Sequence, residues 1–344
     1  MNIVSQETML DARRKYTGTT RVPFTFGGKT EYAEKKLVNG EMQVMHFNKP
    51  LGEMISYGGS NVSKELLRKV VLDVELGREE VQPLYKPIYD TISDSNLPEV
   101  LDAKWALRGV CVFSQSFEGS EVKFGTIEAE NGPTARINTY TAGFEYTKQI
   151  KDFNQSFQVE MLNKAMGEAY NALLNEMYLG PFIKATYKKD NQTAKQAAAE
   201  GEPAFVTMYN TIKEGMKQAI VKKRPASVLL ASKANQLDIE QALRGGYTYN
   251  GTTLPAITGI STIIYYDGWT TTVGKKTTTY KGVPTDKIYL IRPKRGFKEL
   301  VKQDLRIEAN AGDLSRLVEQ QIVGYAYRGV FAAIDENVQE LTIA

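Results

Sequence analysis

Residues 152–181 read DFNQSFQVEMLNKAMGEAYNALLNEMYLGP, and this stretch predicts one long amphipathic helix. Asp152 is a favourable N-cap residue, and Gln155 stands three positions later, which is the spacing of a capping box. Gly180 followed by Pro181 is a typical helix stop. At 1.5 Å per residue such a helix is roughly 40 Å long, more than twice the usual length in globular proteins. We therefore expect a spine that crosses the whole molecule.

The apolar residues of this stretch recur every three to five positions, as expected for one buried face of a helix. This stripe consists of Phe153, Phe157, Leu162, Met166, Ala169, Leu173 and Met177. A helix of this length cannot be hidden inside a compact domain of ordinary size. We therefore expect β-rich segments on either side of it, in a flat and extended subunit rather than in a common enzyme fold.

The composition is that of an ordinary soluble protein. The chain has 344 residues, enough for one large or two ordinary domains, with 42% apolar and 24% charged residues. Its 43 basic and 40 acidic residues give a net charge of +3, far from the strongly basic signature of a dedicated nucleic-acid binder. The first residues lack the apolar core of a signal peptide, and no run of eighteen apolar residues occurs. We expect a protein made in the cytoplasm, with no membrane span.

Residue types that serve catalysis or metal binding are scarce. Cys111 is the only cysteine, which excludes an intramolecular disulfide and a cysteine-based zinc site within one chain. His46 is the only histidine and leaves little room for a histidine metal site or Ser-His-Asp catalysis. We interpret His46 as a surface or interface residue rather than a catalytic base, and Cys111 as a small strand residue rather than a reactive thiol. The glycine pairs belong to no nucleotide-binding motif, so no cofactor is expected.

Upstream of the spine the sequence predicts arms rather than a large core. Residues 1–60 are punctuated by glycines and only weakly periodic, which indicates an arm. A helix is predicted over residues 64–76, and two prolines then favour an extended arm over residues 88–100. Residues 110–141 alternate with the period of a strand and are interrupted by a turn at 118–120, which predicts a long hairpin. Its outer part is polar, so we expect it to lie on another surface.

Downstream of the spine a compact α/β unit is predicted over residues 205–291. Pro203 opens a helix there, and three apolar strands follow, at 226–231, 260–266 and 287–291. Two strand patterns of unusual length come last, at 297–309 and 320–334. We expect these two strands to form a sheet that flanks the spine.

The order of these segments resembles the major capsid protein of tailed bacteriophages, whose Hong Kong 97-like fold encapsulins share. The resemblance is carried by IYDTISDSNLPEV at 88–100, the hairpin at 110–141, FEYT at 144–147 and QIVGYAYRGVFAAIDENV at 321–338. It covers roughly residues 88–344 and rests on architecture, because this family has no strict motif.

The resemblance implies an α+β fold in five parts. They are an N-terminal region and arm (1–107), a β-hairpin called the E-loop (108–145), the spine helix of a peripheral domain (146–204), an axial α/β domain (205–291) and the long strands of the peripheral domain (292–344).

The same resemblance implies a structural protein of the virion, not an enzyme. Many copies would assemble in the host cytoplasm into hexamers and pentamers of an icosahedral head that encloses double-stranded DNA by weak, non-specific contact. No long, charged, helical N-terminal segment is present, which implies a separate scaffolding protein, beside a portal and a candidate decoration protein. Two other functions stay open: an encapsulin-type nanocompartment shell of the same fold, and a β-rich enzyme of unknown chemistry.

Three sets of residues are candidates for contacts with partners. The polar hairpin tip is expected to touch a neighbouring subunit and consists of Phe117, Glu118, Gly119, Ser120, Glu121 and Lys123. The densest basic cluster, Arg292, Lys294 and Arg295, would contact either DNA phosphates or acidic groups of a neighbouring subunit. Some capsid proteins of this type join an E-loop lysine to an asparagine of a neighbour, which makes Lys123 and Asn310 a candidate cross-link pair.

Overall fold

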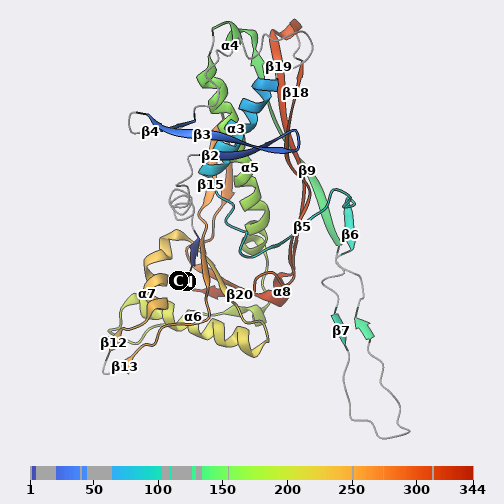
Figure 1. The fold of residues 1–344 in the computed structure, drawn as a ribbon. Coiled ribbons are helices and arrows are strands. Elements are labelled where there is room, and N and C mark those ends of the chain that lie inside the picture. Colours follow the sequence, from blue (N-terminus) through green and yellow to red (C-terminus); the bar gives the residue numbers. More distant parts are fainter. Residues whose placement is uncertain are drawn as a thin grey trace, which may run out of the picture.

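A long helix joins two β-sheets in an elongated molecule (Figure 1). The computed structural model describes residues 2–4, 21–38, 41–44, 64–102, 108–110, 126–128, 134–153, 155–249, 252–273, 275–311 and 314–343. One sheet has five strands and flanks the upper part of the helix, and the other has six strands and lies at its lower end. The expected α+β architecture with a central spine is therefore confirmed.

The spine is helix α5 (Ser156–Lys184), whose 29 residues span roughly 43 Å at 1.5 Å per residue. Both predicted ends are wrong. Asp152 closes the short helix α4 (Lys148–Asp152), and the N-cap of α5 is Gln155, whose side chain makes no capping bond. At the other end α5 continues through Pro181, because a proline removes only one backbone donor and the Ala185 N–H still bonds to the Pro181 carbonyl at 3.1 Å.

The buried face of α5 differs from the predicted apolar stripe. Phe153 is 71% exposed, Leu162 is 40% exposed, and Leu173 is half-buried. The core positions are Val159, Met166, Tyr170, Leu174, Tyr178, Leu179 and Phe182. The helix is rotated toward this face because its asparagines lie there and find hydrogen-bond partners.

Three buried asparagines of α5 hold helix α3 (Lys64–Glu80) and the segment that follows it. Asn163 donates from Nδ2 to Asp73 Oδ2 at 2.9 Å. Asn171 donates to the carbonyls of Arg78 and Val81, each at 2.8 Å. Asn175 Nδ2 donates to the Gln82 carbonyl at 2.9 Å, and its Oδ1 accepts from the Leu84 N–H at 2.8 Å. Asn171 and Asn175 thus satisfy main-chain groups at and after the end of α3, and Asn163 pairs with a buried carboxylate within it.

Two glycines let α3 and α5 touch backbone to backbone. A Cβ on Gly167 would lie 2.0 Å from the Val74 carbonyl oxygen, and a Cβ on Gly77 would lie 2.0 Å from that of Lys164. Real Cβ atoms essentially never come so close, so only glycine fits at either position without moving a helix.

The peripheral sheet has the strand order β5-β18-β19-β9-β6. Its strands are β5 (Asp90–Ser93), β18 (Phe297–Ala311), β19 (Val318–Ala332), β9 (Thr134–Thr147) and β6 (Val100–Asp102). The two expected long strands are confirmed as β18 and β19, each of 15 residues. The segment 88–100, expected as an extended arm, contains the strand β5, which pairs in parallel with β18, and Ile88 and Tyr89 at its start are buried, so this part of the arm packs on its own subunit.

The α/β unit is a mixed sheet of order β1-β14-β11-β17-β20-β10, covered on one face by the end of α5 and on the other by two helices. Its elements are β1 (Asn2–Val4), β10 (Gln192–Thr193), α6 (Ala204–Val221), β11 (Val228–Ala231), α7 (Gln236–Arg244), β14 (Thr262–Tyr265), β17 (Lys287–Ile291) and β20 (Val338–Thr342). The predicted strands appear as β11, β14 and β17. Strand β20 comes from the part expected to be peripheral (292–344), yet it pairs with β17 inside this sheet.

Smaller elements extend from these two bodies. The strands are β2 (Arg21–Phe26), β3 (Lys29–Val38), β4 (Glu41–Val44), β7 (Arg108–Val110), β8 (Thr126–Glu128), β12 (Thr248–Tyr249), β13 (Thr252–Thr253), β15 (Gly268–Val273) and β16 (Lys276–Lys281). Helix α8 (Ile334–Asn337) and 3-10 turns at Lys189–Asn191, Lys233–Asn235 and Leu314–Arg316 complete the described parts. Strands β7 and β8 pair within the segment predicted as a hairpin and lie apart from both sheets (Figure 1).

A buried network of charges ties the peripheral sheet to the spine. Arg328 of β19 is 4% exposed and donates to Glu299 Oε1 at 2.5 Å, to Asp304 Oδ1 at 2.7 Å and to the Tyr170 hydroxyl at 2.7 Å. Glu299 of β18 is fully buried and also accepts bonds from the Tyr85 hydroxyl at 2.8 Å and from Lys86 Nζ at 3.0 Å.

This network keeps its carboxylates ionised. Burial opposes ionisation of Glu299, but the hydrogen bond from Thr91 and the charge of Lys86 outweigh it, so the pKa of Glu299 lies below its usual value. Burial likewise opposes ionisation of Asp304, and the Arg328 and Arg78 guanidinium groups nevertheless hold its pKa below the usual range.

We predict that Gly167→Ala destabilises the chain by about 1–3 kcal/mol, because the new methyl group must push α3 and α5 apart. The matched control is Gly180→Ala in the same helix. There a Cβ would come no closer than 3.4 Å to the Glu176 side chain, so the better helix propensity of alanine should leave stability unchanged or raise it by up to ~1 kcal/mol. Urea melts measure both, and equal effects would contradict the close helix contact.

Arg328→Met should cost about 3–5 kcal/mol of unfolding free energy, because it removes the buried cation that contacts both Glu299 and Asp304. Arg316→Met is the control. Its guanidinium lies 3.8 Å from Glu145 with 67% of the side chain exposed, so its loss should cost less than about 1 kcal/mol. Guanidinium chloride melts at neutral pH compare the two, and a small effect for Arg328→Met would disprove the structural role of the network.

Acid should weaken the fold through Glu299. Because its pKa is lower in the folded chain than the ordinary 4.5, its contribution is fully present above about pH 5 and is lost as pH falls below 4.5. The difference in unfolding free energy between the wild type and Glu299→Gln should therefore be largest near neutral pH and shrink between about pH 5 and pH 3. Urea melts across this pH range measure it, and a difference that grows on acidification would refute the assignment.

Candidate functional site

The densest set of titratable groups does not form an accessible reaction centre. Glu299 has no exposed surface, and its oxygens are engaged by Tyr85, Lys86, Thr91 and Arg328. A carboxylate that is closed off in this way has no route to a substrate. This network therefore serves the fold.

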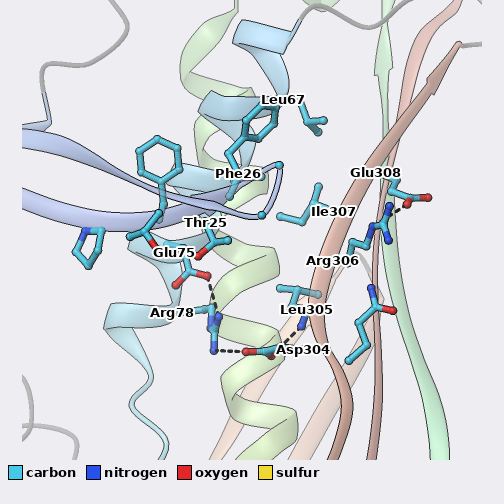
Figure 2. A pocket seen from close by; sticks show the side chains of 17 residues that line it. Thr25, Phe26, Leu67, Glu75, Arg78, Asp304, Leu305, Arg306, Ile307 and Glu308 are labelled. Atoms are coloured by element: carbon cyan, nitrogen blue, oxygen red, sulfur yellow. Dashed lines mark hydrogen bonds and ion pairs between the residues drawn. The ribbon is translucent and has the colours of Figure 1, made fainter. Parts of the chain in front are cut away.

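A groove of about 930 Å³ lies between the β2–β3 hairpin, helix α3 and strand β18 (Figure 2). Half-buried apolar side chains line it from three elements: Phe26 of the hairpin, Leu67 of α3, and Leu305 and Ile307 of β18. The hairpin is positioned by Phe24, which is buried against Leu72 of α3.

The charged groups around this groove are paired with one another. Arg78 Nη1 contacts Glu75 Oε1 at 2.8 Å, and Arg78 Nη2 lies 3.9 Å from Asp304 Oδ2 (Figure 2). On β18, Arg306 Nε lies 2.9 Å from Glu308 Oε1. Such an apolar groove with satisfied charges is suited to receiving an extended polypeptide, not to acid–base chemistry.

The groove follows an open edge of the peripheral sheet. Strand β5 pairs with β18 only over residues 298–301, and in the described part of the chain no strand continues alongside residues 303–311. The opposite edge is similar, because β6 pairs with β9 only over residues 134–136. Along residues 303–309 of β18 and 138–147 of β9, the edges pair with no further strand of the described structure, and such edges can pair with a strand from another chain.

Large apolar side chains are exposed at the end of the molecule that carries α4. Phe153 is 71% exposed, Leu317 is 63% exposed and Met161 is 55% exposed. The Lys148 N–H donates to the Leu317 carbonyl at 2.8 Å, which holds the start of α4 against the turn between β18 and β19. Exposed apolar residues gathered at one end are typical of a surface that another protein covers.

The predicted basic cluster lies in the turn between β17 and β18. Arg292 donates from Nη1 to the Lys223 carbonyl at 3.1 Å, which brings the second basic run, Lys222–Arg224, to the same place. Lys294 and Arg295 are exposed. Both runs are visible in the sequence, but nothing in the sequence predicts that they lie side by side.

The remaining predicted residues are not brought together by the described structure. The hairpin tip at 117–123, with Lys123, lies outside the described residues, as do His46 and Cys111. Asn310 is exposed on β18 opposite Gln321, so the cross-link pair stays a prediction. Within the described ranges no group of three or more His, Cys, Asp or Glu side chains is arranged to hold a metal ion. None of the described helices is long and apolar enough to cross a membrane.

Comparison by sequence finds no relative: no protein-family profile matches the chain, and no curated protein matches it. Comparison by structure does find similar folds. The mature capsid of bacteriophage PhiM1 matches with a TM-score of 0.52 at 9% identity, over 75% of this chain and 86% of that one.

Two further solved structures are similar at lower scores. The capsid of cyanophage P-SCSP1u matches with a TM-score of 0.49 at 12% identity, over 76% of this chain and 88% of that one. An encapsulin complex from Synechococcus elongatus matches with a TM-score of 0.43 at 12% identity, over 77% of this chain and 88% of that one. The fold assignment rests on the PhiM1 capsid, and the chain has the Hong Kong 97-like fold of phage capsid subunits.

Proposed function

We propose that this chain is the major capsid protein of a tailed bacteriophage, which assembles into hexamers and pentamers of an icosahedral head around double-stranded DNA. The observation that carries the proposal is the shared fold with the PhiM1 capsid over 86% of that chain. Because one fold can serve different functions, the proposal also depends on the surface features of this chain.

Three features of the surface support assembly. Each is a place that the described residues leave uncovered: the edge of β18 beside its apolar groove, the partly paired edge of β9, and the exposed apolar residues near α4. Different surfaces on one subunit favour heterologous contacts, and such contacts close into rings when the rotation between subunits permits.

The proposed role is structural, without catalysis or a cofactor. The charged groups that lie closest together serve the fold, and the groove offers packing rather than reactive groups. A separate scaffolding protein, a portal and a decoration protein are the further partners that this role requires or permits. If purified particles contain a protein cargo instead of DNA, the chain forms an encapsulin-type shell and the phage-head proposal is wrong.

The hairpin between β6 and β9 is proposed to reach a neighbouring subunit. Deleting residues 118–125 and joining the flanks through a short turn should leave the subunit folded but block assembly, because strands β7 and β8 pair with each other and lie apart from both sheets. Negative-stain microscopy and light scattering measure assembly, and urea melts report folding. If the deletion unfolds the subunit, the hairpin belongs to its core, and if the shortened chain assembles normally, the hairpin is not the contact.

A further inference from the structure

Two basic runs that are distant in the sequence form one surface where the two sheets meet. Lys222 and Lys223 follow α6, and the run from Arg292 to Arg295 follows β17. The Arg292 guanidinium donates to the Lys223 carbonyl at 3.1 Å and joins the two. We call this surface the basic corner; it consists of Lys189, Lys222, Lys223, Arg292, Lys294 and Arg295.

Arg224 is the buried centre of this corner. It is only 6% exposed and donates to Asn191 Oδ1 at 2.7 Å and to Gln339 Oε1 at 2.6 Å. It also donates to the main-chain carbonyls of Asp190 at 2.6 Å and Asp335 at 3.0 Å. These bonds fix the backbone beside Lys189 and the end of α6, so the cations around Arg224 are held in place.

Arg224 forms no direct ion pair within the described structure, although the carboxylates of Asp190 and Asp335 lie close enough to act on its charge. Every acceptor that it contacts there is an amide or carbonyl oxygen, and no described carboxylate forms an ion pair with it. The equally buried Arg328 is different, because it contacts two carboxylates, at 2.5 and 2.7 Å. A buried cation that is balanced only through space, and not by a direct ion pair, adds to the positive potential of the lysines and arginines around it.

The surface of the corner is also positive. Lys222 lies 3.4 Å from the Asp190 carboxylate, but Lys189, Lys223 and Arg295 form no ion pair with any described residue. Lys223 and Lys294 have φ angles of 59° and 65°, in the left-handed region that residues with a side chain rarely adopt. At Lys223 this conformation is the usual left-handed end of a helix, because the Arg224 N–H bonds back to the Ala219 carbonyl of α6 at 2.9 Å.

We infer that the basic corner binds the phosphate groups of a nucleic-acid backbone. Arginine forks and lysine ammonium groups are the side chains that bind phosphate, and a row of phosphates would pair with the cations that form no ion pair here: Lys189, Lys223 and Arg295. Lysine predominates among the corner's cations, and lysine is depleted in protein–protein interfaces, which favours nucleic acid over an acidic protein surface. The choice of double-stranded DNA as the source of phosphate rests on the proposed function.

The test measures binding of a fluorescent DNA duplex of about 30 base pairs to the full-length chain, by anisotropy, from about 50 to 300 mM NaCl. The corner variant is Lys189→Gln, Lys223→Gln and Arg295→Gln combined. The control variant, Lys275→Gln, Lys276→Gln and Lys281→Gln combined, removes the same charge from exposed lysines of the β15–β16 hairpin. Melting curves check that both variants fold, and inorganic phosphate and polyphosphate are added as competitors.

The corner variant should bind at least ten times more weakly at about 100 mM NaCl, with a salt dependence that is shallower by about one unit for each lost phosphate contact. The control variant should stay within about twofold of the wild type, and polyphosphate should compete far better than free phosphate. Equal losses in both variants, or no binding by the wild type at about 50 mM NaCl, would overturn the inference.

A different result would assign the corner to a protein contact. If the corner variant binds DNA like the wild type but no longer forms particles in negative-stain microscopy, the corner meets acidic groups of a neighbouring subunit, and the inference is wrong. DNA binding and particle formation also test the inference and the proposed function separately. A chain that binds DNA through the corner but never assembles contradicts the capsid role and leaves the phosphate site standing.

Discussion

The pairing of Arg328 with Glu299 is the interaction on which the peripheral half of the molecule depends. The two residues lie on adjacent strands, and their shared partners extend to the spine through Tyr170 and to the segment before β5 through Tyr85. A shift of β18 against β19 by one residue would turn one of these charges to the other face of the sheet and leave its partner buried alone. One buried network thus fixes the strand register, the position of the spine and the course of residues 85–91.

Much of the fold is predictable from the sequence because periodic apolar patterns report burial directly. The strands around residues 229, 289, 300 and 325 were correctly expected, as was a spine of about the observed length. Polar burial explains the failures. The amides of Asn163, Asn171 and Asn175 stand at helical spacing and mark the true inner face of α5, but a search for apolar stripes ignores asparagine. The pairing of β20 into the α/β sheet is long-range, and no local pattern encodes it.

The candidate sites were less predictable, because each is formed by segments distant in the sequence. The basic runs near residues 223 and 294 are visible as charge, but their union depends on the turn after β17 meeting the end of α6. The groove joins the β2–β3 hairpin to β18 across more than half of the chain. A local signal did exist for Glu299: in strand alternation it shares a face with the apolar Phe297 and Val301, and a charged residue on an apolar face indicates a buried partner.

In the proposed capsid role a subunit must fold by itself and still leave surfaces for its neighbours to cover. Its internal stability comes from glycine-mediated helix contact and from paired charges that need no neighbour. In the described structure the surfaces left for a neighbour include strand edges. Open strand edges favour aggregation, because they can also pair with a strand of the wrong chain. On β18 the exposed Arg306 and Glu308 place charges of both signs beside this edge. A strand from an unrelated protein would have to present the opposite charge at both positions, which disfavours wrong pairing. When each contact is weak but selective in this way, a misplaced subunit dissociates before its neighbours close around it. A closed shell of such subunits is then stable because of the number of its contacts, not the strength of any single one.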